Sequence, residues 1–271
     1  MSEAKGRCEI GVLVRADGSA RWRQQFHNAK DVSSSLSSRE ADETSGNDAS
    51  SVLAAVYAPR LAFGGAGGGG GGGGGAELGE RASVEVSIRS AEGGGARAPL
   101  RCMEATCCGA LEAILLREAY PRCTISVHVQ IERDAGGIES CIVNAAVAAC
   151  IDAGLQMTGL LVAMSFAVQP NGTVNVDPDA RAIADAKAAV HIVLLARAID
   201  DDGRDADDSK QQQQQQQQNK EDRNDVVAFT SIGILDTRAL DKCMALSRNT
   251  KQSLVEAMRR PFLRAEAAAI A

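Results

Sequence analysis

Short stretches in which apolar and polar residues alternate recur along this chain and predict many β-strands. The clearest stretch is 124–133, in which polar residues separate four aliphatic ones, Ile125, Val127, Val129 and Ile131. A period of two is typical of a strand with one buried face. Similar or shorter apolar runs predict further strands at 8–14, 52–57, 83–89, 160–168, 174–176, 190–196 and 226–235. We expect His128, on the polar face of the first stretch, to be a hydrogen-bonded structural residue, because no second histidine lies near it in the sequence.

Three segments have the spacing of helices. Apolar residues recur at helical intervals over 102–116, and 140–152 is apolar nearly all round, which predicts a deeply buried helix. A last helix is expected after Asp236 or Thr237, either of which can cap it, with Pro261 interrupting its tail. Several strands followed by helices, without strict βαβ alternation, predict a mixed α+β fold.

Three low-complexity segments interrupt this pattern, and we expect them to be inserts in a single domain over 1–271. Residues at about 25–50 are rich in Ser, Asp, Glu and Asn, 64–76 are almost pure glycine, and 200–225 combine an acidic run with eight consecutive glutamines. Such compositions do not pack a core. The glycine tract satisfies G-x-G-x-x-G trivially, and no strand–helix–acid arrangement surrounds it, so we expect no dinucleotide cofactor.

The distribution of charge changes the picture of possible partners. The formal net charge is −6, but 31–48 carry −4 and 200–225 carry −5, so the remainder of the chain carries +3. The body of the protein is therefore mildly basic, which is compatible with a nucleic-acid partner. Aromatic residues make up only 3% of the chain, which argues against RNA binding by stacked aromatic platforms.

The sequence predicts neither a membrane segment nor a metal centre. The longest apolar run, near 160–168, is shorter than the roughly 20 residues that span a bilayer. The charged N-terminus and the short apolar run behind it do not predict a signal peptide. The eight cysteines show no C-x-x-C spacing and the chain has only three histidines, so we expect reduced, structural cysteines, a nuclear or cytosolic protein and no bound zinc.

Several motifs, in the same order and at similar spacing, resemble those of the RNase PH-like family, and together they cover the chain apart from the inserts. They are 15–20 (R-A-D-G-S-A), 51–59 (S-V-L-A-A-V-Y-A-P), 120–125 (Y-P-R-C-T-I), 134–137 (D-A-G-G), 144–146 (N-A-A), 152–157 (D-A-G-L-Q-M) and 172–178 (G-T-V-N-V-D-P). Within the family, the first and last of these are most similar to a ring component of the eukaryotic RNA exosome. The resemblance implies the RNase PH-like α+β fold, with mixed sheets packed against helices.

Active members of this family shorten RNA from its 3′ end by phosphorolysis, in which inorganic phosphate attacks the terminal phosphodiester and releases a nucleoside diphosphate. Such a site needs cationic and hydroxyl groups that hold phosphate, and carboxylates for a metal or for proton transfer. The resemblance implies that Ile138 and Glu139 stand where active members have a hydroxyl and an arginine. Active members also carry two aspartates six residues apart, and the resemblance matches the first to Asp177 and the second to Ile183.

The resemblance therefore implies a degenerate active site. The arginines that precede the first helix in active members match Ala98 and Pro99, although Arg97 and Arg101 lie close. Asp177 is the residual catalytic position, and together with Asp179 it is the best remaining pair of metal ligands. On a turn that contains proline, however, such carboxylates more often cap or solvate the turn.

The expected function is a non-catalytic subunit of the exosome ring that supports 3′-to-5′ RNA processing and degradation, including rRNA maturation. The resemblance implies RNA, other RNase PH-like ring subunits and RNA-binding cap subunits as partners, and the nucleus, nucleolus and cytoplasm as locations. Candidate phosphate-backbone contacts are Arg60, Arg97, Arg101 and Arg122, since arginine binds phosphate without reading sequence, although each also fits an ordinary surface arginine. Two alternatives stay open: a homo-oligomeric phosphate-dependent 3′-to-5′ exoribonuclease, and a metal-dependent hydrolytic nuclease that uses Asp177.

Overall fold

A computed structural model describes residues 6–25, 49–61, 80–91, 97–196 and 225–270. The predicted inserts lie almost entirely outside these residues, so the single domain over 1–271 stays a prediction. The strands are β1 (Gly6–Ile10), β2 (Gly18–Gln25), β3 (Ala49–Leu61), β4 (Ser83–Ser90), β5 (Cys123–Arg133), β6 (Leu160–Val168), β7 (Val174–Val176), β8 (Ala188–Ala196) and β9 (Val226–Gly233). The helices are α1 (Arg97–Ile114), α2 (Ile138–Asp152), α3 (Ala180–Ala184) and α5 (Thr237–Ile270), with a 3₁₀ turn, η2 (Arg117–Ala119).

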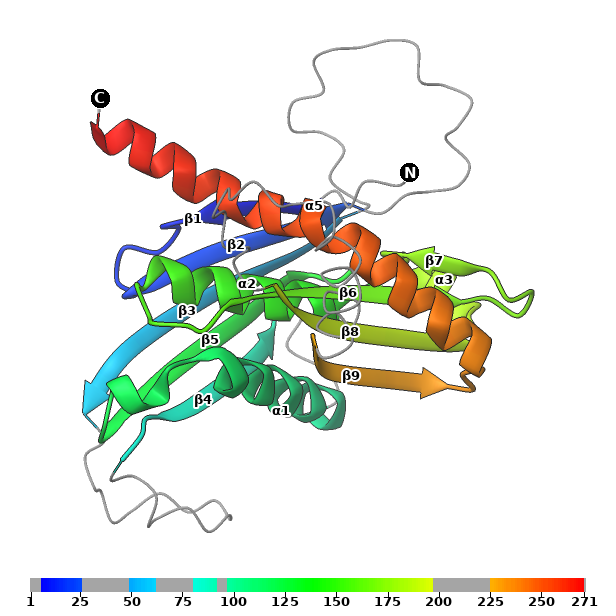
Figure 1. The fold of residues 1–271 in the computed structure, drawn as a ribbon, viewed down its shortest axis with the longest axis horizontal. Helices are drawn as coiled ribbons and strands as arrows, with labels where there is room; N and C mark the ends of the chain where they lie inside the picture. The colour runs from blue at the N-terminus through cyan, green and yellow to red at the C-terminus, as the bar shows by residue number, and fades with distance from the viewer. Residues whose placement is uncertain (1–5, 26–48, 62–79, 92–96, 197–224, 271) are drawn as a thin grey trace, which may run out of the picture.

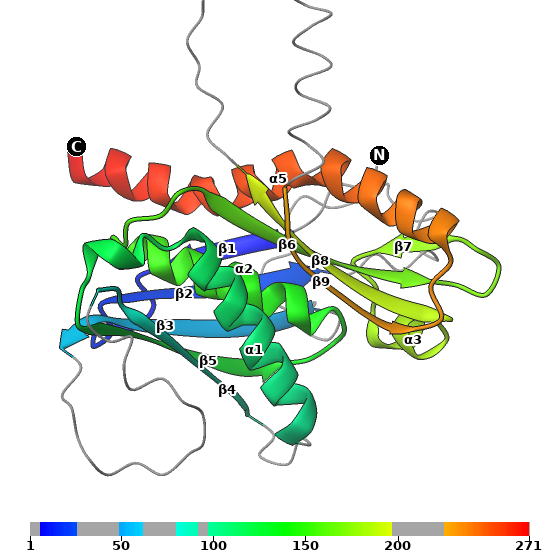
Figure 2. The same ribbon diagram turned by 60° about the horizontal axis from the view of Figure 1, so that its bottom comes forward.

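The strands form two sheets that enclose a layer of helices (Figure 1). The N-terminal sheet has the order β1-β2-β3-β5-β4 and the C-terminal sheet the order β7-β6-β8-β9. All neighbouring strands are antiparallel except β4 and β5, which are parallel. Helices α1 and α2 lie between the sheets, whereas α5 covers the other face of the C-terminal sheet and reaches β1 (Figure 2).

Helix α2 is the centre of the core because it packs against both sheets. Its sequence is rich in alanine and other small residues, so both sheets can approach its backbone closely. Nearly every residue from Ile138 to Cys150 is buried, as its apolar pattern predicts. Asn144 is the polar exception in the middle of the helix, and its side-chain amide bonds the backbone of Ala163 on β6.

The structure corrects several expectations about individual elements. Strand β2 has no strong apolar alternation, yet it places Trp22 at the centre of the N-terminal sheet with no exposed surface. The short helix α3 was also not predicted. Pro261 does not end α5, which continues to Ile270. Proline removes one backbone hydrogen bond from a helix, and the alanine-rich residues that follow have the helix propensity to continue.

Candidate functional site

The loop before α2 and the turn after β7, which carry two of the family-like motifs, contact each other. The Ala180 N–H donates to the Ala135 carbonyl at 2.8 Å. The Ser50 hydroxyl accepts from the Ala135 N–H at 2.9 Å and donates to the Gly136 carbonyl at 2.7 Å. A Cβ atom added at Gly136 would lie 2.5 Å from the Pro178 carbonyl oxygen. Glycine at 136 therefore allows the two segments to meet, and together they form the candidate site.

The N-terminus of α2 faces this site without a side-chain cap. Gly137 is the N-cap residue, with φ 53° and ψ 27°, and no side chain bonds the first turn of the helix. Free N–H groups and the helix dipole favour an anion at such a position. Here the first turn supplies its own negative charge, because Glu139 lies in it. Burial raises the pKa of the Glu139 carboxyl.

Asp177 lies inside the protein and not on the surface of its turn. Its side chain is 9% exposed, its φ is 49°, and its backbone N–H donates to the Ser165 carbonyl. Burial raises the pKa of Asp177 to about 6, partly offset by a hydrogen bond with Gln24. A carboxylate in this setting has a structural role, in contrast to the residual catalytic position that the sequence suggests.

A different pair of aspartates has the six-residue interval of active family members. Asp179 caps α3, where its carboxylate accepts from the Ala182 N–H at 2.7 Å, and Asp185 is the C-cap residue of the same helix. At about 1.5 Å per residue their backbones are roughly 9 Å apart. The sequence-based match started the interval two residues too early, at Asp177, and counting from Asp179 would have found this pair.

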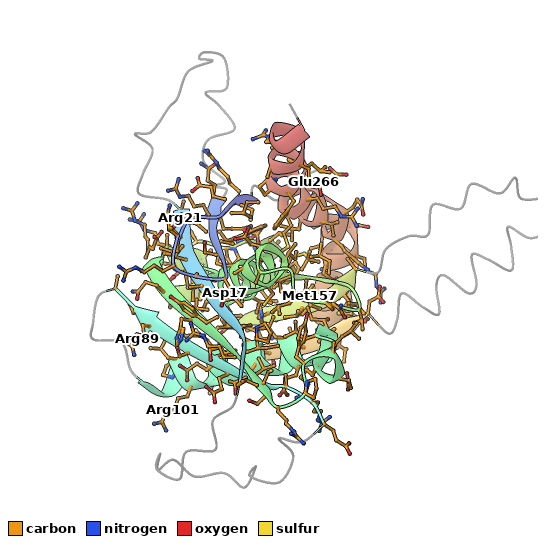
Figure 3. The ribbon with its side chains drawn as sticks, turned by 90° about the vertical axis from the view of Figure 1, so that its left-hand side faces the viewer. Asp17, Arg21, Arg89, Arg101, Met157 and Glu266 are labelled. Atoms are coloured by element: carbon orange, nitrogen blue, oxygen red, sulfur yellow. The ribbon has the colours of Figure 1, made fainter. Side chains whose placement is uncertain are left out.

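The four candidate arginines do not form one patch. Arg60 pairs in register with Thr124, and Arg122 precedes that strand, so both lie where β5 begins. Helix α1 follows β4, which is parallel to β5, so Arg97 and Arg101 lie at the opposite end of the sheet, beside the candidate site. Figure 3 shows Arg101 on that side of the molecule. The 11 residues of β5 span about 35 Å.

Arg60 and His128 belong to a cluster on the outer face of the N-terminal sheet. The Arg60 guanidinium lies 4.6 Å from the centroid of the Tyr57 ring, and that ring meets His128 edge-to-face at 5.6 Å. The His128 Nδ1 atom is 2.6 Å from the Ser87 hydroxyl. His128 is therefore a hydrogen-bonded structural residue, as the sequence predicts. Arg101 and Arg122 are exposed, and the side chain of Arg97 is outside the described part of the chain.

A cavity of about 30 Å³ opens beside the candidate site, between α1, α2, β8 and β9. Its lining residues are Cys102, Met103, Thr106, Glu139, Ile142, Val143, His191 and Thr230. His191 is 3% exposed, and neither of its ring nitrogens has a hydrogen-bond partner. Burial lowers the pKa of His191 to about 4. A single histidine in an apolar strand gives no signal in the sequence, so its role was not predicted.

The described residues contain no cluster of three or more His, Cys, Asp or Glu side chains that could hold a metal ion. All eight cysteines are free thiols, and five of them are buried, as the apolar surroundings of most of them suggest. Within the described part of the chain, no helix is both long and apolar enough to cross a membrane.

The family follows from comparison with known proteins. Residues 5–156, more than half of the chain, match the model of the RNase PH family, described as the 3′ exoribonuclease family, domain 1. The chain belongs to the RNase PH family. It is 28% identical over 186 residues to the rice protein named exosome complex exonuclease RRP46 homolog, which covers 69% of this chain and 64% of that protein. The Arabidopsis thaliana protein of the same name is 36% identical over 69 residues, 26% of this chain and 29% of that protein.

Solved structures show the fold. The crystal structure of rice Rrp46 superposes with a TM-score of 0.67 and 23% identity, covering 95% of this chain and 94% of that one. An archaeal exosome core structure gives a TM-score of 0.62 and 15% identity, with 95% and 87% covered. The predicted RNase PH-like α+β fold is confirmed, and so is the resemblance to the type called ribosomal RNA-processing protein forty-six. The chain spans less than two thirds of the length of these two curated relatives.

Proposed function

We propose that this RNase PH family member is a non-catalytic subunit of an exosome ring that supports 3′-to-5′ RNA processing and degradation, including rRNA maturation. Exosome membership is supported by the similarity to proteins named RRP46 homolog and to the archaeal protein named exosome complex component Rrp41. One observation carries the non-catalytic role: Glu139 places a carboxylate in the first turn of α2, where family members with activity attract phosphate.

The electrostatic consequence of this exchange is large. At about 4 Å and an effective dielectric constant of about 20, two unit charges interact by about 4 kcal/mol. An arginine there attracts phosphate by roughly this amount, whereas the Glu139 carboxylate repels it when ionised. Ile138, which is 8% exposed, also offers no hydroxyl donor. Removal of one such donor typically costs a factor of about 100 to 1000 in rate, so the combined loss removes useful phosphorolysis.

The partners in this proposal are RNA, other RNase PH-like subunits and RNA-binding cap subunits, and the location is the nucleus, nucleolus and cytoplasm. Arg101 is the candidate RNA contact that the geometry favours, because it is exposed and precedes Cys102 and Met103, which line the cavity beside the loop. Arg60 and Arg122, at the far end of β5, would contact a different stretch of RNA.

A second candidate function is a phosphate-dependent 3′-to-5′ exoribonuclease, and one observation favours it. Asp179 and Asp185 retain the six-residue interval that active members use. Glu139 argues against it, because it opposes phosphate binding. The hydrolytic alternative that uses Asp177 has less support, since that carboxylate is buried and bonded to Gln24.

Native purification of the tagged chain tests the ring proposal. We expect several different RNase PH-like proteins to co-purify in equal amounts, identified by mass spectrometry, because a subunit without its own chemistry acts only within an assembly. The same preparation of the isolated chain should release no nucleoside diphosphate from RNA in the presence of phosphate. A preparation that contains only copies of this chain and releases nucleoside diphosphates would instead establish the exoribonuclease.

Glu139→Arg alone is expected to leave phosphorolysis of a 3′-labelled RNA at background, because Ile138 still supplies no hydroxyl. The double variant Ile138→Thr/Glu139→Arg restores both groups of the phosphate loop and is the informative comparison. Any activity gained in the double variant should disappear when Asp185→Asn is added, if the Asp179 and Asp185 pair is the surviving carboxylate pair. Activity in the single variant would contradict the degenerate site.

A further inference from the structure

The cavity beside the loop has apolar walls and a polar end. Met103, Ile142 and Val143 supply the walls, whereas Glu139 and His191 supply a carboxylate and an imidazole. These two polar groups come from different elements, the first turn of α2 and the middle of β8. Such an arrangement suits an aliphatic stem that ends in a polar or charged head.

Both polar groups lack hydrogen-bond donors. His191 has no partner at either ring nitrogen, and because burial lowers its pKa to about 4, it is neutral at pH 7 and one nitrogen is an acceptor. Within the described part of the chain no lysine or arginine acts on Glu139, whose raised pKa has burial as its only cause. Buried polar groups in folded proteins are normally bonded, so the cavity calls for a donor that the described chain does not supply.

We propose that the cavity receives the ε-ammonium group of a lysine from a neighbouring chain of the assembly, which makes Glu139 a cation receptor at the position where active relatives bind an anion. This inference rests on the proposed ring function. An ammonium group has three N–H donors and no acceptor. It can therefore donate to the Glu139 carboxylate and to the His191 nitrogen at the same time.

The size of the cavity favours lysine over arginine. A volume of about 30 Å³ has room for about two water-sized groups, since one needs roughly 10–15 Å³. An ammonium nitrogen and its adjacent methylene fill that space, whereas the four heavy atoms of a guanidinium exceed it. Phosphate is excluded by charge as well as by size, because Glu139 repels it. Threonine hydroxyls at 106 and 230 line the same cavity and add no positive charge.

The first experiment measures the chemistry of the cavity on the isolated full chain. Ethylammonium chloride is titrated at constant ionic strength while the ¹⁵N signals of the His191 ring are followed by NMR. We expect a saturable shift with ethylammonium and none with tetramethylammonium, which carries the same charge without N–H donors. The shift should vanish in Glu139→Gln and persist in Glu118→Gln, a matched change at an exposed glutamate on η2. Absence of a saturable shift in the unmodified chain overturns the inference whatever the state of assembly.

The second experiment uses the purified assembly. Its structure should show a neighbouring chain's lysine Nζ within about 3 Å of Glu139, and Glu139→Gln should weaken incorporation of the chain about 10- to 100-fold, as expected for loss of a buried charge pair. Glu118→Gln should leave incorporation unchanged. A cavity in the assembly that holds only water, an arginine or a nucleotide overturns the inference while the ring function stands. An ethylammonium response without any ring assembly would overturn the proposed function, and with it the neighbouring chain as the source of the lysine.

Discussion

Asn144→Ala is expected to lower the free energy of unfolding by about 3 kcal/mol, because it removes both hydrogen-bond partners of one buried peptide group. The Asn144 side-chain Nδ2 donates to the Ala163 carbonyl at 3.0 Å, and the Ala163 N–H donates to Oδ1 at 2.8 Å. Strand β7 pairs only with the last three residues of β6. The amide of Asn144 therefore takes the place of a strand beside Ala163, and each buried group left unpaired costs about 1–3 kcal/mol.

Urea denaturation followed by circular dichroism measures this loss. Asn175→Ala is the matched control, since Asn175 is exposed on β7, and it should change stability by less than about 0.5 kcal/mol. Asn144→Asp keeps an acceptor but removes the donor to the Ala163 carbonyl, so it should also be destabilised at neutral pH. Equal effects of Asn144→Ala and the control would show that water or a shifted strand replaces the amide at no cost.

The fold could be predicted where side-chain period and burial agree. Strand β5 and helix α2 follow directly from their apolar patterns, because one buries alternate residues and the other is buried all round. Strand β2 could not be found in this way, since its inward positions include Gln24, which is buried because it accepts from the Trp22 indole N–H at 2.9 Å. A polar residue whose partner is supplied by the fold is indistinguishable, in sequence, from a surface residue.

The candidate site was predicted in its identity but not in its arrangement. The motifs located the loop at 134–137 and its changed residues, Ile138 and Glu139. Spacing alone did not distinguish Asp177 from Asp179, because the two differ only in which way the turn after β7 directs them, inward or onto the cap of α3. The cavity at His191 depends on four elements far apart in sequence, so no local pattern could reveal it.

Asp177→Asn is expected to raise the free energy of unfolding by about 3 kcal/mol at pH 7 and to have little effect at pH 4. Burial raises the pKa of Asp177 from 3.8 to about 6, so the folded protein disfavours the charged form. Stability associated with the protonated carboxyl is fully present below pH 3.8 and is lost as pH rises through about 6. One pKa unit corresponds to about 1.4 kcal/mol, which gives the stated magnitude. Asparagine stays neutral and keeps an acceptor for Gln24, so it avoids this loss.

The pH profile of the variant also exposes an opposing contribution from His191. Because burial lowers its pKa from 6.5 to about 4, His191 destabilises the fold as pH falls from 6.5 to 4, over nearly the range in which protonation of Asp177 stabilises it. The unmodified chain should therefore show a shallow profile, and Asp177→Asn a steep loss of stability on acidification. Adding His191→Gln should flatten that profile again, while Glu118→Gln, at an exposed carboxylate, should reproduce the unmodified chain. A profile that Asp177→Asn leaves unchanged would mean that the Asp177 carboxylate is hydrated in the folded protein, and its candidacy as a metal ligand would have to be restored.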